Sequence, residues 1–216
     1  GLITGRVTFV NIIKYMKMAA SSNFGNVLSV LGATLLLPFL PMAPMQLLVQ
    51  NLLYDLSQVA IPFDDVDPEY VVLPRKWAVP ELGQFMLCIG PISSLFDYGT
   101  FALMWFVFQA NDEESQALFQ SGWFVEGLLS QTLIVHLIRT SKVPFMESSA
   151  APAVTLATAS IMAVGVCVPF TPLGAAIGLT RLPPEYFLWL VLILTAYCVL
   201  TQKLKRLYIL RFKSWL

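Results

Sequence analysis

The chain has 216 residues and no formal net charge; 57% of its residues are hydrophobic and only 12% are charged. A soluble domain carries about twice that share of charged residues, so this composition, with a mean hydropathy of +0.72, indicates a membrane protein. A neutral chain offers no electrostatic basis for binding nucleic acid, and we expect no nucleic-acid partner.

Six apolar segments follow one another along the chain, and a membrane-spanning helix needs roughly 20 such residues. The segments cover approximately 18–40, 43–63, 84–108, 121–139, 152–170 and 186–202. Polar or Pro- and Gly-rich stretches separate them, such as the loop 62–81. We therefore predict an all-α membrane protein, a six-transmembrane-helix bundle.

The distribution of Lys and Arg predicts the orientation of this bundle. If the N-terminus is cytoplasmic and the six spans alternate, every Lys and Arg except Arg181 lies on the cytoplasmic side, including Arg75 and Lys76. Both termini are then cytoplasmic. The last span continues into a basic amphipathic tail, 203–216, which we expect to anchor on anionic lipids.

The cysteines and the single histidine give little sign of a metal or redox site. Cys88, Cys167 and Cys198 are isolated from one another, without a CxxC pair or a Cys/His cluster. We expect them to be buried thiols in helices. His136 lies near the cytoplasmic end of the fourth span, where we expect it to be solvated or at the level of the lipid headgroups.

Among the ionisable residues inside the predicted spans, Asp55 has the largest number of polar neighbours. It lies in the stretch VQNLLYDLSQ (49–58). Charge within a span is costly, so it suggests a functional site. Asn51 lies four residues before Asp55 and Gln58 three residues after it, on nearly the same helical face.

The preceding span contributes a second polar group in SSNFGN (21–26). Asn23 and Asn26 are three residues apart and share a face. Gly25 between them allows another backbone or an ion to approach closely. The two segments thus offer amide oxygens and one carboxylate towards a common point.

Such oxygen ligands suit Mg²⁺ or Ca²⁺ rather than zinc or copper, and Mg²⁺ is often held by one or two carboxylates while it keeps several waters. We predict Asn23, Asn26, Asn51 and Asp55 as metal ligands. The alternative is that these side chains only hydrogen-bond helices together. Asp97 and Glu126 are secondary candidates, which line a second ion path or hold a buried partner.

Several motifs resemble P-type cation ATPases, and the resemblance covers essentially the whole chain. GRVTFVNIIKYMKMAASSNFGN (5–26) resembles the entry into the family's fifth membrane helix, and QNLLYD (50–55) the sixth, where an Asn-x-x-x-Asp pair binds the ion. LPRKW (73–77) resembles the family's cytoplasmic connection to the seventh helix. SGWFVEGLLSQTLIVHLIRT (121–140) is similar to the bacterial magnesium-transporting members.

The resemblance implies the C-terminal transmembrane domain, residues 1–216, of a magnesium-importing pump in the bacterial inner membrane. Calcium pumps carry a glutamate where this chain has Asn26, so this chain carries fewer charges at the site. Fewer charges agree with the binding of a single, less dehydrated Mg²⁺. The family's phosphorylated DKTGT motif does not occur here, and GLITG, without a methionine, suggests a processed chain or a fragment. We therefore expect no catalytic or cofactor-binding residue in this chain.

The implied partner is the N-terminal remainder of the same pump, with its phosphorylation, nucleotide-binding and actuator domains and its first four membrane helices. ATP would act only through those domains, so we expect this chain alone to be inactive. Two alternatives stay open. One is an independent six-span carrier or channel for divalent cations, which needs a complete pathway within these residues. The other is a structural membrane scaffold in which Asp55 only pins helices together.

Overall fold

The structure is a computed structural model that describes all residues except 73–75 and 77. Arg75 and most of the LPRKW motif therefore lie outside the described residues. Every regular element in the described part of the chain is helical. The all-α prediction is thus confirmed.

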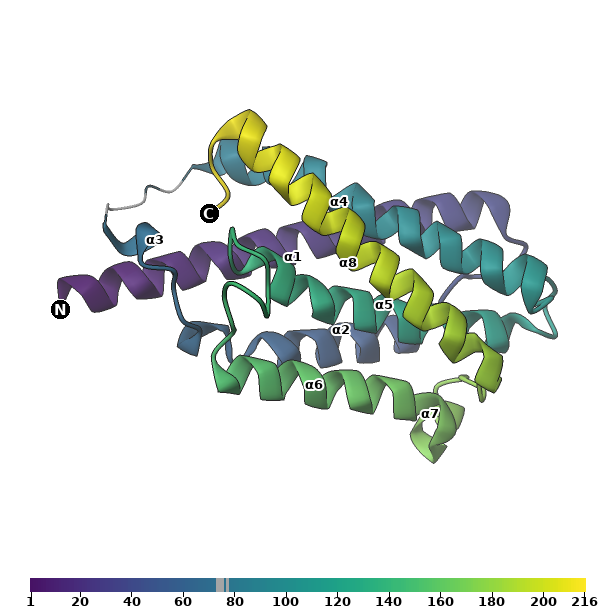
Figure 1. The fold of residues 1–216 in the computed structure, drawn as a ribbon. Coiled ribbons are helices and arrows are strands. Elements are labelled where there is room, and N and C mark those ends of the chain that lie inside the picture. The colour runs from purple at the N-terminus through teal and green to yellow at the C-terminus, as the bar shows by residue number, and fades with distance from the viewer. Residues whose placement is uncertain (73–75, 77) are drawn as a thin grey trace.

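Six long helices overlap the six predicted spans (Figure 1). They are α1 (Leu2–Leu36), α2 (Pro44–Gln58), α4 (Val79–Ala102, continued by a π-helix Leu103–Val107), α5 (Gln116–Ile138), α6 (Pro152–Cys167) and α8 (Pro184–Phe212). Two short helices, α3 (Glu69–Val72) and α7 (Pro172–Ala176), and the 3-10 turns Ile61–Phe63 and Val168–Phe170 lie between them. Proline occupies the first position of α2, α6 and α8, where its missing N–H costs nothing.

The helix α5 forms the centre of the bundle. It packs against α1, α2, α4, α6 and α8, and nearly all of its side chains are buried. In the described chain, three helical segments are long and apolar enough to cross a membrane by length and composition: Val79–Val107, Pro152–Phe170 and Pro184–Phe212. The central α5 instead carries polar side chains, which the surrounding helices can partner within the protein.

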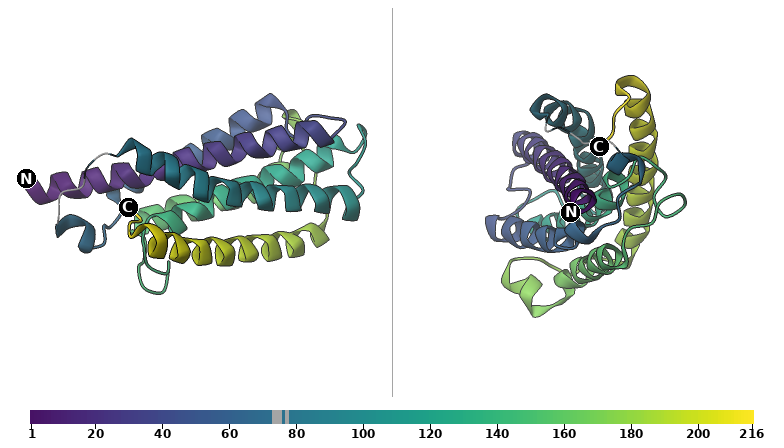
Figure 2. Two further views of the ribbon diagram at one scale, coloured as in Figure 1. Left: turned by 90° about the horizontal axis from the view of Figure 1, so that it is seen from above. Right: turned by 90° about the vertical axis from the view of Figure 1, so that its left-hand side faces the viewer.

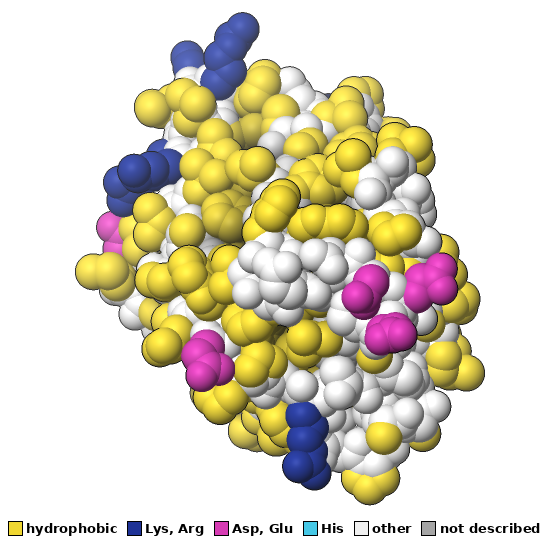
Figure 3. Space-filling model, turned by 90° about the vertical axis from the view of Figure 1, so that its right-hand side faces the viewer, with side chains coloured by type: hydrophobic (Ala, Val, Ile, Leu, Met, Phe, Trp, Pro, Cys, Tyr) yellow, Lys and Arg dark blue, Asp and Glu magenta, His cyan; other side chains and the backbone are white. Residues whose placement is uncertain are grey.

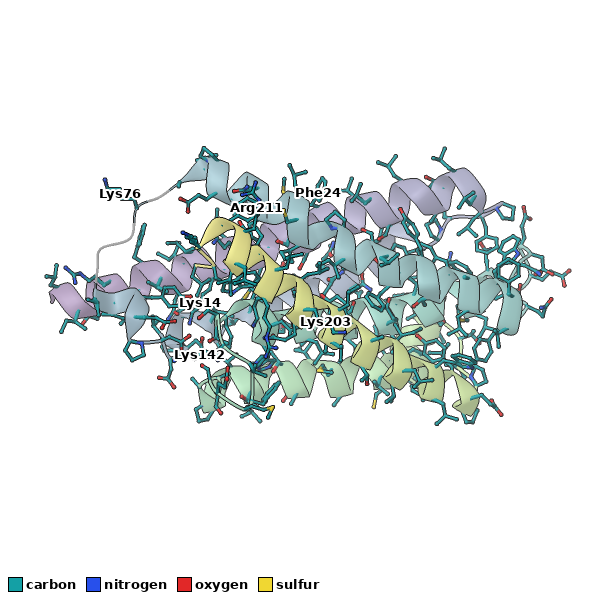
Figure 4. The ribbon with its side chains drawn as sticks, turned by 45° about the horizontal axis from the view of Figure 1, so that its top comes forward. Lys14, Phe24, Lys76, Lys142, Lys203 and Arg211 are labelled. Carbon is teal, nitrogen blue, oxygen red and sulfur yellow. The ribbon has the colours of Figure 1, made fainter. Side chains whose placement is uncertain are left out.

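Both termini lie at one end of the bundle (Figures 1 and 2). Lys14, Lys76 and Lys142 lie towards this end (Figure 4). Acidic side chains gather on the opposite end face, which the exposed 112–114 segment between α4 and α5 helps to form (Figure 3). The positive-inside rule concerns only Lys and Arg, and the position of these three lysines agrees with it, while the cytoplasmic location of the termini stays a prediction.

The helices α1 and α4 cross closely at two glycines. A Cβ on Gly25 would lie 2.8 Å from the carbonyl oxygen of Gly90, and a Cβ on Gly90 would lie 2.8 Å from the ring of Phe24 (labelled in Figure 4). The space beside Gly25 is therefore taken by the backbone of α4. Of the two uses predicted for this glycine, the structure shows the close approach of another helix.

Two expectations about local environment are wrong. Cys88 and Cys167 are free thiols on the outer surface of the described chain rather than buried, because their positions on α4 and α6 point away from α5. His136 is buried, and its Nε2 lies 2.8 Å from Thr158 Oγ1. It faces the neighbouring α6 because every face of α5 is covered.

The predicted basic tail is largely the end of α8. The helix continues to Phe212, and Trp215 then turns back into the bundle, where its indole N–H donates to the carbonyl of Ile138 at 2.9 Å. Lys205 is fully buried, so it cannot reach lipid. Lys203, Arg206, Arg211 and Lys213 remain exposed and are the part of the tail that could contact anionic headgroups.

Candidate functional site

Three of the four predicted metal ligands lie on the exposed side of α1 and α2. In the described chain Asn51 and Asp55 are exposed on α2, Asn23 is exposed on α1, and Asn26 is half-buried. Exposed apolar side chains surround the three exposed residues, including Val27 at 57% and Leu52 at 57% exposure.

A hydrogen-bonded junction joins α1 and α2 beside these residues. The hydroxyls of Ser22 and Tyr54 lie 2.8 Å apart, and the amide of Gln58 donates to the Tyr54 hydroxyl at 2.8 Å. Asn23 and Asp55 each follow a member of this junction in the sequence, but in the described structure no hydrogen bond joins Asn23 to Asn51 or Asp55. We expected Gln58 to share the face of Asp55. Instead, the Gln58 side chain is buried and turns inward to Tyr54, while Asp55 is exposed.

Asn26 faces the centre of the bundle, where it contacts a residue that was not predicted as part of the site. The amide of Gln131 on α5 donates to Asn26 Oδ1 at 2.7 Å. Gln131 is 5% exposed, and its own carbonyl oxygen is buried without a hydrogen-bond partner among the described residues. An amide within a membrane span was the signal that could have identified it.

The inner side of α2 uses glutamines in a different way. Gln46 donates to Gln120 Oε1 and to the carbonyl of Ile177, both at 3.0 Å, and Gln50 donates to the carbonyl of Phe124 at 3.0 Å. These bonds fasten α2 to α5 and to the loop after α7. Asn51 and Asp55 make no such contact with the described helices, which leaves their oxygens available to a ligand.

The secondary candidates, Asp97 and Glu126, lie together in the interior between α4 and α5. Asp97 Oδ2 accepts a hydrogen bond from Ser29 of α1 at 2.5 Å, and Oδ1 accepts one from the indole N–H of Trp123 at 2.9 Å. Glu126 is fully buried within hydrogen-bonding reach of Asp97. Both of its oxygens lack a donor among the described protein groups.

A third polar cluster, at the end with the termini, was not predicted. Asp64, in the loop after α2, is completely buried and pairs with Lys14 of α1 at 2.7 Å and with Arg139, just after α5, at 2.9 Å. Burial lowers the pKa of Lys14, and the charge of Asp64 acts against this shift. The cluster locks the base of α1 to the end of α5.

The donor set limits the chemistry that the candidate site can perform. In the part of the chain that the structure describes, no group of three or more His, Cys, Asp or Glu side chains could hold a metal ion. An ion beside α1 and α2 would therefore be bound mainly by the amides of Asn23, Asn26 and Asn51 and by the carboxylate of Asp55. Such a set suits a hard, partly hydrated cation.

Comparison with known proteins gives one matching family and several similar relatives. The family described as "Cation transporting ATPase, C-terminus" matches residues 39–207. A protein of Salmonella typhimurium named "Magnesium-transporting ATPase, P-type 1" is 59% identical over 215 residues, 100% of this chain. The protein of the same name from Escherichia coli is 58% identical over 212 residues, 98% of this chain.

A more distant relative carries a different cation in its name. The "Calcium-transporting ATPase" of Bacillus subtilis is 29% identical over 185 residues, which are 82% of this chain and 21% of that protein. The chain spans only 24% of the length of the magnesium-transporting relatives. The similarity therefore concerns one region of much longer proteins.

Proposed function

This chain belongs to the family formed by the C-terminal region of cation-transporting ATPases, and we propose that it is the transport domain of an ATP-driven, magnesium-importing P-type pump. It is homologous to the C-terminal part of bacterial magnesium-transporting P-type ATPases. The proposal places the chain in the bacterial inner membrane with both termini in the cytoplasm. ATP is hydrolysed by phosphorylation, nucleotide-binding and actuator domains elsewhere in the pump.

The observation that carries the proposal is the polar group on the outer side of α1 and α2. Asn23, Asn51 and Asp55 are exposed there among apolar side chains. Polar groups facing lipid are costly, so a membrane protein keeps them only where other protein or an ion covers them. Further membrane helices of the same pump, the first four in the family scheme, would cover this face and complete the site.

The chemistry of these residues supports Mg²⁺ as the transported ion. Asp55 supplies the one carboxylate, while Asn23, Asn26 and Asn51 supply neutral oxygens. Mg²⁺ gives up its water reluctantly and is commonly held by one or two carboxylates with several waters retained. Gln131 positions Asn26 from the opposite side, and its unpartnered oxygen adds a fifth candidate ligand.

Coupling to ATP hydrolysis would run through α1. This helix begins at Leu2, is fixed to Asp64 through Lys14, and carries Asn23 and Asn26 further along. A displacement imposed on its N-terminal end by the phosphorylation domain would therefore move two candidate ligands relative to Asp55 on α2. The exposed cations of 203–216 would hold the end of α8 at anionic lipids during this movement.

Asp55→Asn in the full-length pump tests the proposal. The amide keeps the shape and removes the charge, so Mg²⁺ uptake by intact cells and Mg²⁺-stimulated ATP hydrolysis should be lost while the protein still accumulates in the membrane. Glu185→Gln is the matched control, since Glu185 is exposed at the start of α8, away from the site. It should transport at the wild-type rate.

Wild-type uptake by the Asp55→Asn pump would refute the assignment of Asp55 as a ligand. Loss of uptake together with a lowered thermal unfolding midpoint would instead favour a structural scaffold. Mg²⁺ flux through liposomes that contain this chain alone would favour an independent carrier or channel.

A further inference from the structure

Asp97 and Glu126 are the two acidic side chains of this chain that meet inside the bundle. Asp97 is 3% exposed and Glu126 is completely buried. Glu126 lies one helical turn after Trp123, whose indole N–H donates to Asp97 at 2.9 Å, so the two carboxyl groups interact. Neither takes part in an ion pair within the described residues.

The hydrogen bonds around the pair are distributed unevenly. Ser29 and Trp123 donate to the two oxygens of Asp97, which together can stabilise a carboxylate. Neither oxygen of Glu126 has a geometrically well-formed hydrogen bond from a described protein group, although the hydroxyls of Thr100 and Ser130 lie beside it; the Ser130 hydroxyl donates to the carbonyl of Gly127 at 3.1 Å, and that of Thr100 has no other partner. Two ionised carboxyl groups in contact would repel each other in this buried place. The arrangement therefore requires a proton on one of the two carboxyl groups.

No other titratable side chain near the pair, among the described residues, provides a positive charge that would allow both carboxyl groups to ionise. Tyr98 is on the same helix as Asp97, while Tyr186 and Tyr197 approach from α8. Tyr186 already donates its hydroxyl proton to the carbonyl of Gly122 at 2.5 Å. From α1 the facing group is the neutral hydroxyl of Ser29. None of these groups supplies a positive charge.

We propose that Asp97 and Glu126 form a proton-binding site in which a single proton is shared between the two carboxyl groups. Glu126 donates to Asp97, and Asp97 holds the remaining negative charge with Ser29 and Trp123. The ligand is a proton rather than a metal ion, because no third acidic side chain, cysteine or histidine joins the pair in the described structure. This assignment uses none of the proposed magnesium ligands.

The helix α1 links this pair to the other candidate residues. Ser29 lies one turn beyond Gly25, whose carbonyl oxygen is 3.0 Å from the Ser29 hydroxyl oxygen and accepts a hydrogen bond from Ser94 of α4 at 2.8 Å. Asn26, bonded to Gln131, follows Gly25 directly. A movement of α1 would thus change both the donor to Asp97 and the position of Asn26, so proton binding and metal binding would influence each other.

Infrared difference spectroscopy of the purified full-length protein tests the assignment at neutral pH. A protonated carboxyl group gives a carbonyl band that shifts in D₂O. Glu126→Gln and Asp97→Asn should each abolish this band, because each removes one of the two groups that share the proton. Asp55→Asn should leave it unchanged, which separates the test from the proposed metal site.

Two serine variants control for indirect effects. Ser29→Ala should shift the band without abolishing it, since Asp97 loses one donor. Ser93→Ala should not shift it, because Ser93 bonds the carbonyl of Gly90 on its own helix. A band that persists in both folded carboxyl variants, or is absent from the wild-type protein, would overturn the proposal. If neither variant folds, an unshifted band in Ser29→Ala would overturn it.

Discussion

Two regions of this bundle bury charged side chains in different ways. At the end with the termini, Asp64 is bonded to Lys14 and Arg139, and its Oδ1 also accepts the backbone N–H of Ala151 at 3.2 Å. Halfway along α5, neither the Glu126 carboxyl oxygens nor the Gln131 carbonyl oxygen has a hydrogen-bond partner among the described residues. Both regions are buried, but the Asp64 carboxylate has two cationic partners, whereas the Glu126 carboxyl group has none among the described residues.

The difference separates the two tasks that a buried polar group can perform. A complete network adds order, because each partner fixes the position of the others. An incomplete network costs free energy, and it persists where the missing partner is a ligand. We therefore propose that the Asp64 cluster holds helices in place and that the polar groups in the middle of the bundle bind ligands.

The largest expected effect on stability comes from Asp64→Asn. The amide leaves Lys14 and Arg139 buried without a counter-charge, and breaking a buried ion pair from one side costs about 3–5 kcal/mol. Thermal unfolding of the purified full-length protein should show a much lower midpoint. Asp65→Asn is the control, since the exposed Asp65 side chain lies next in sequence. Equal midpoints for the two variants would show that the cluster does not stabilise the fold.

Lys205→Met should destabilise the same end of the bundle to a smaller extent. The ammonium of Lys205 donates to the carbonyls of Leu137, Thr140 and Lys142 at 2.8–3.1 Å, and thereby caps the end of α5. Loss of the shared donor should cost roughly 1–3 kcal/mol in the free energy of unfolding. Lys203→Met removes the same charge from the exposed face of α8 and should leave the unfolding midpoint unchanged.

Gln131→Leu probes the middle region, where function rather than stability should suffer. Asn26 loses its donor, which costs about 1 kcal/mol. The Mg²⁺ concentration for half-maximal ATP hydrolysis by the full-length pump should rise roughly tenfold, equivalent to about 1.4 kcal/mol of binding free energy. Gln120→Leu is the control on the same helix, because Gln120 bonds Gln46 and the carbonyl of Leu40. It should lower stability without changing the response to Mg²⁺.

The helices could be predicted because their signals are local. Runs of about 20 apolar residues marked the spans, and prolines at 44, 152 and 184 mark the starts of three helices. The limits were less accurate: the first span was extended to residue 40, but α1 ends at Leu36, before the extended backbone of Leu37. Leu36 and Leu37 are both apolar, so hydropathy alone could not locate the end of the helix between them.

The polar contacts could not be predicted, because they join residues that are far apart in the sequence. Asp64 was assigned to a polar loop, and nothing near it indicates Lys14, 50 residues earlier. Gln131 is 105 residues from Asn26. The predicted ligands Asn51 and Asp55 depend on neighbours that this chain does not supply, so the metal site stays a prediction.

Glu126→Gln should have the smallest effect on stability, and it makes the same chemical change as Asp64→Asn. The Gln amide can donate to Asp97 as the protonated Glu126 does, so the free energy of unfolding should change by less than about 1 kcal/mol at neutral pH. The unfolding midpoint should equal or exceed that of the wild-type protein. A loss as large as that of Asp64→Asn would mean that Glu126 is ionised and that Asp97 carries the proton or has a cationic partner. The contrast between a complete and an incomplete region would then disappear.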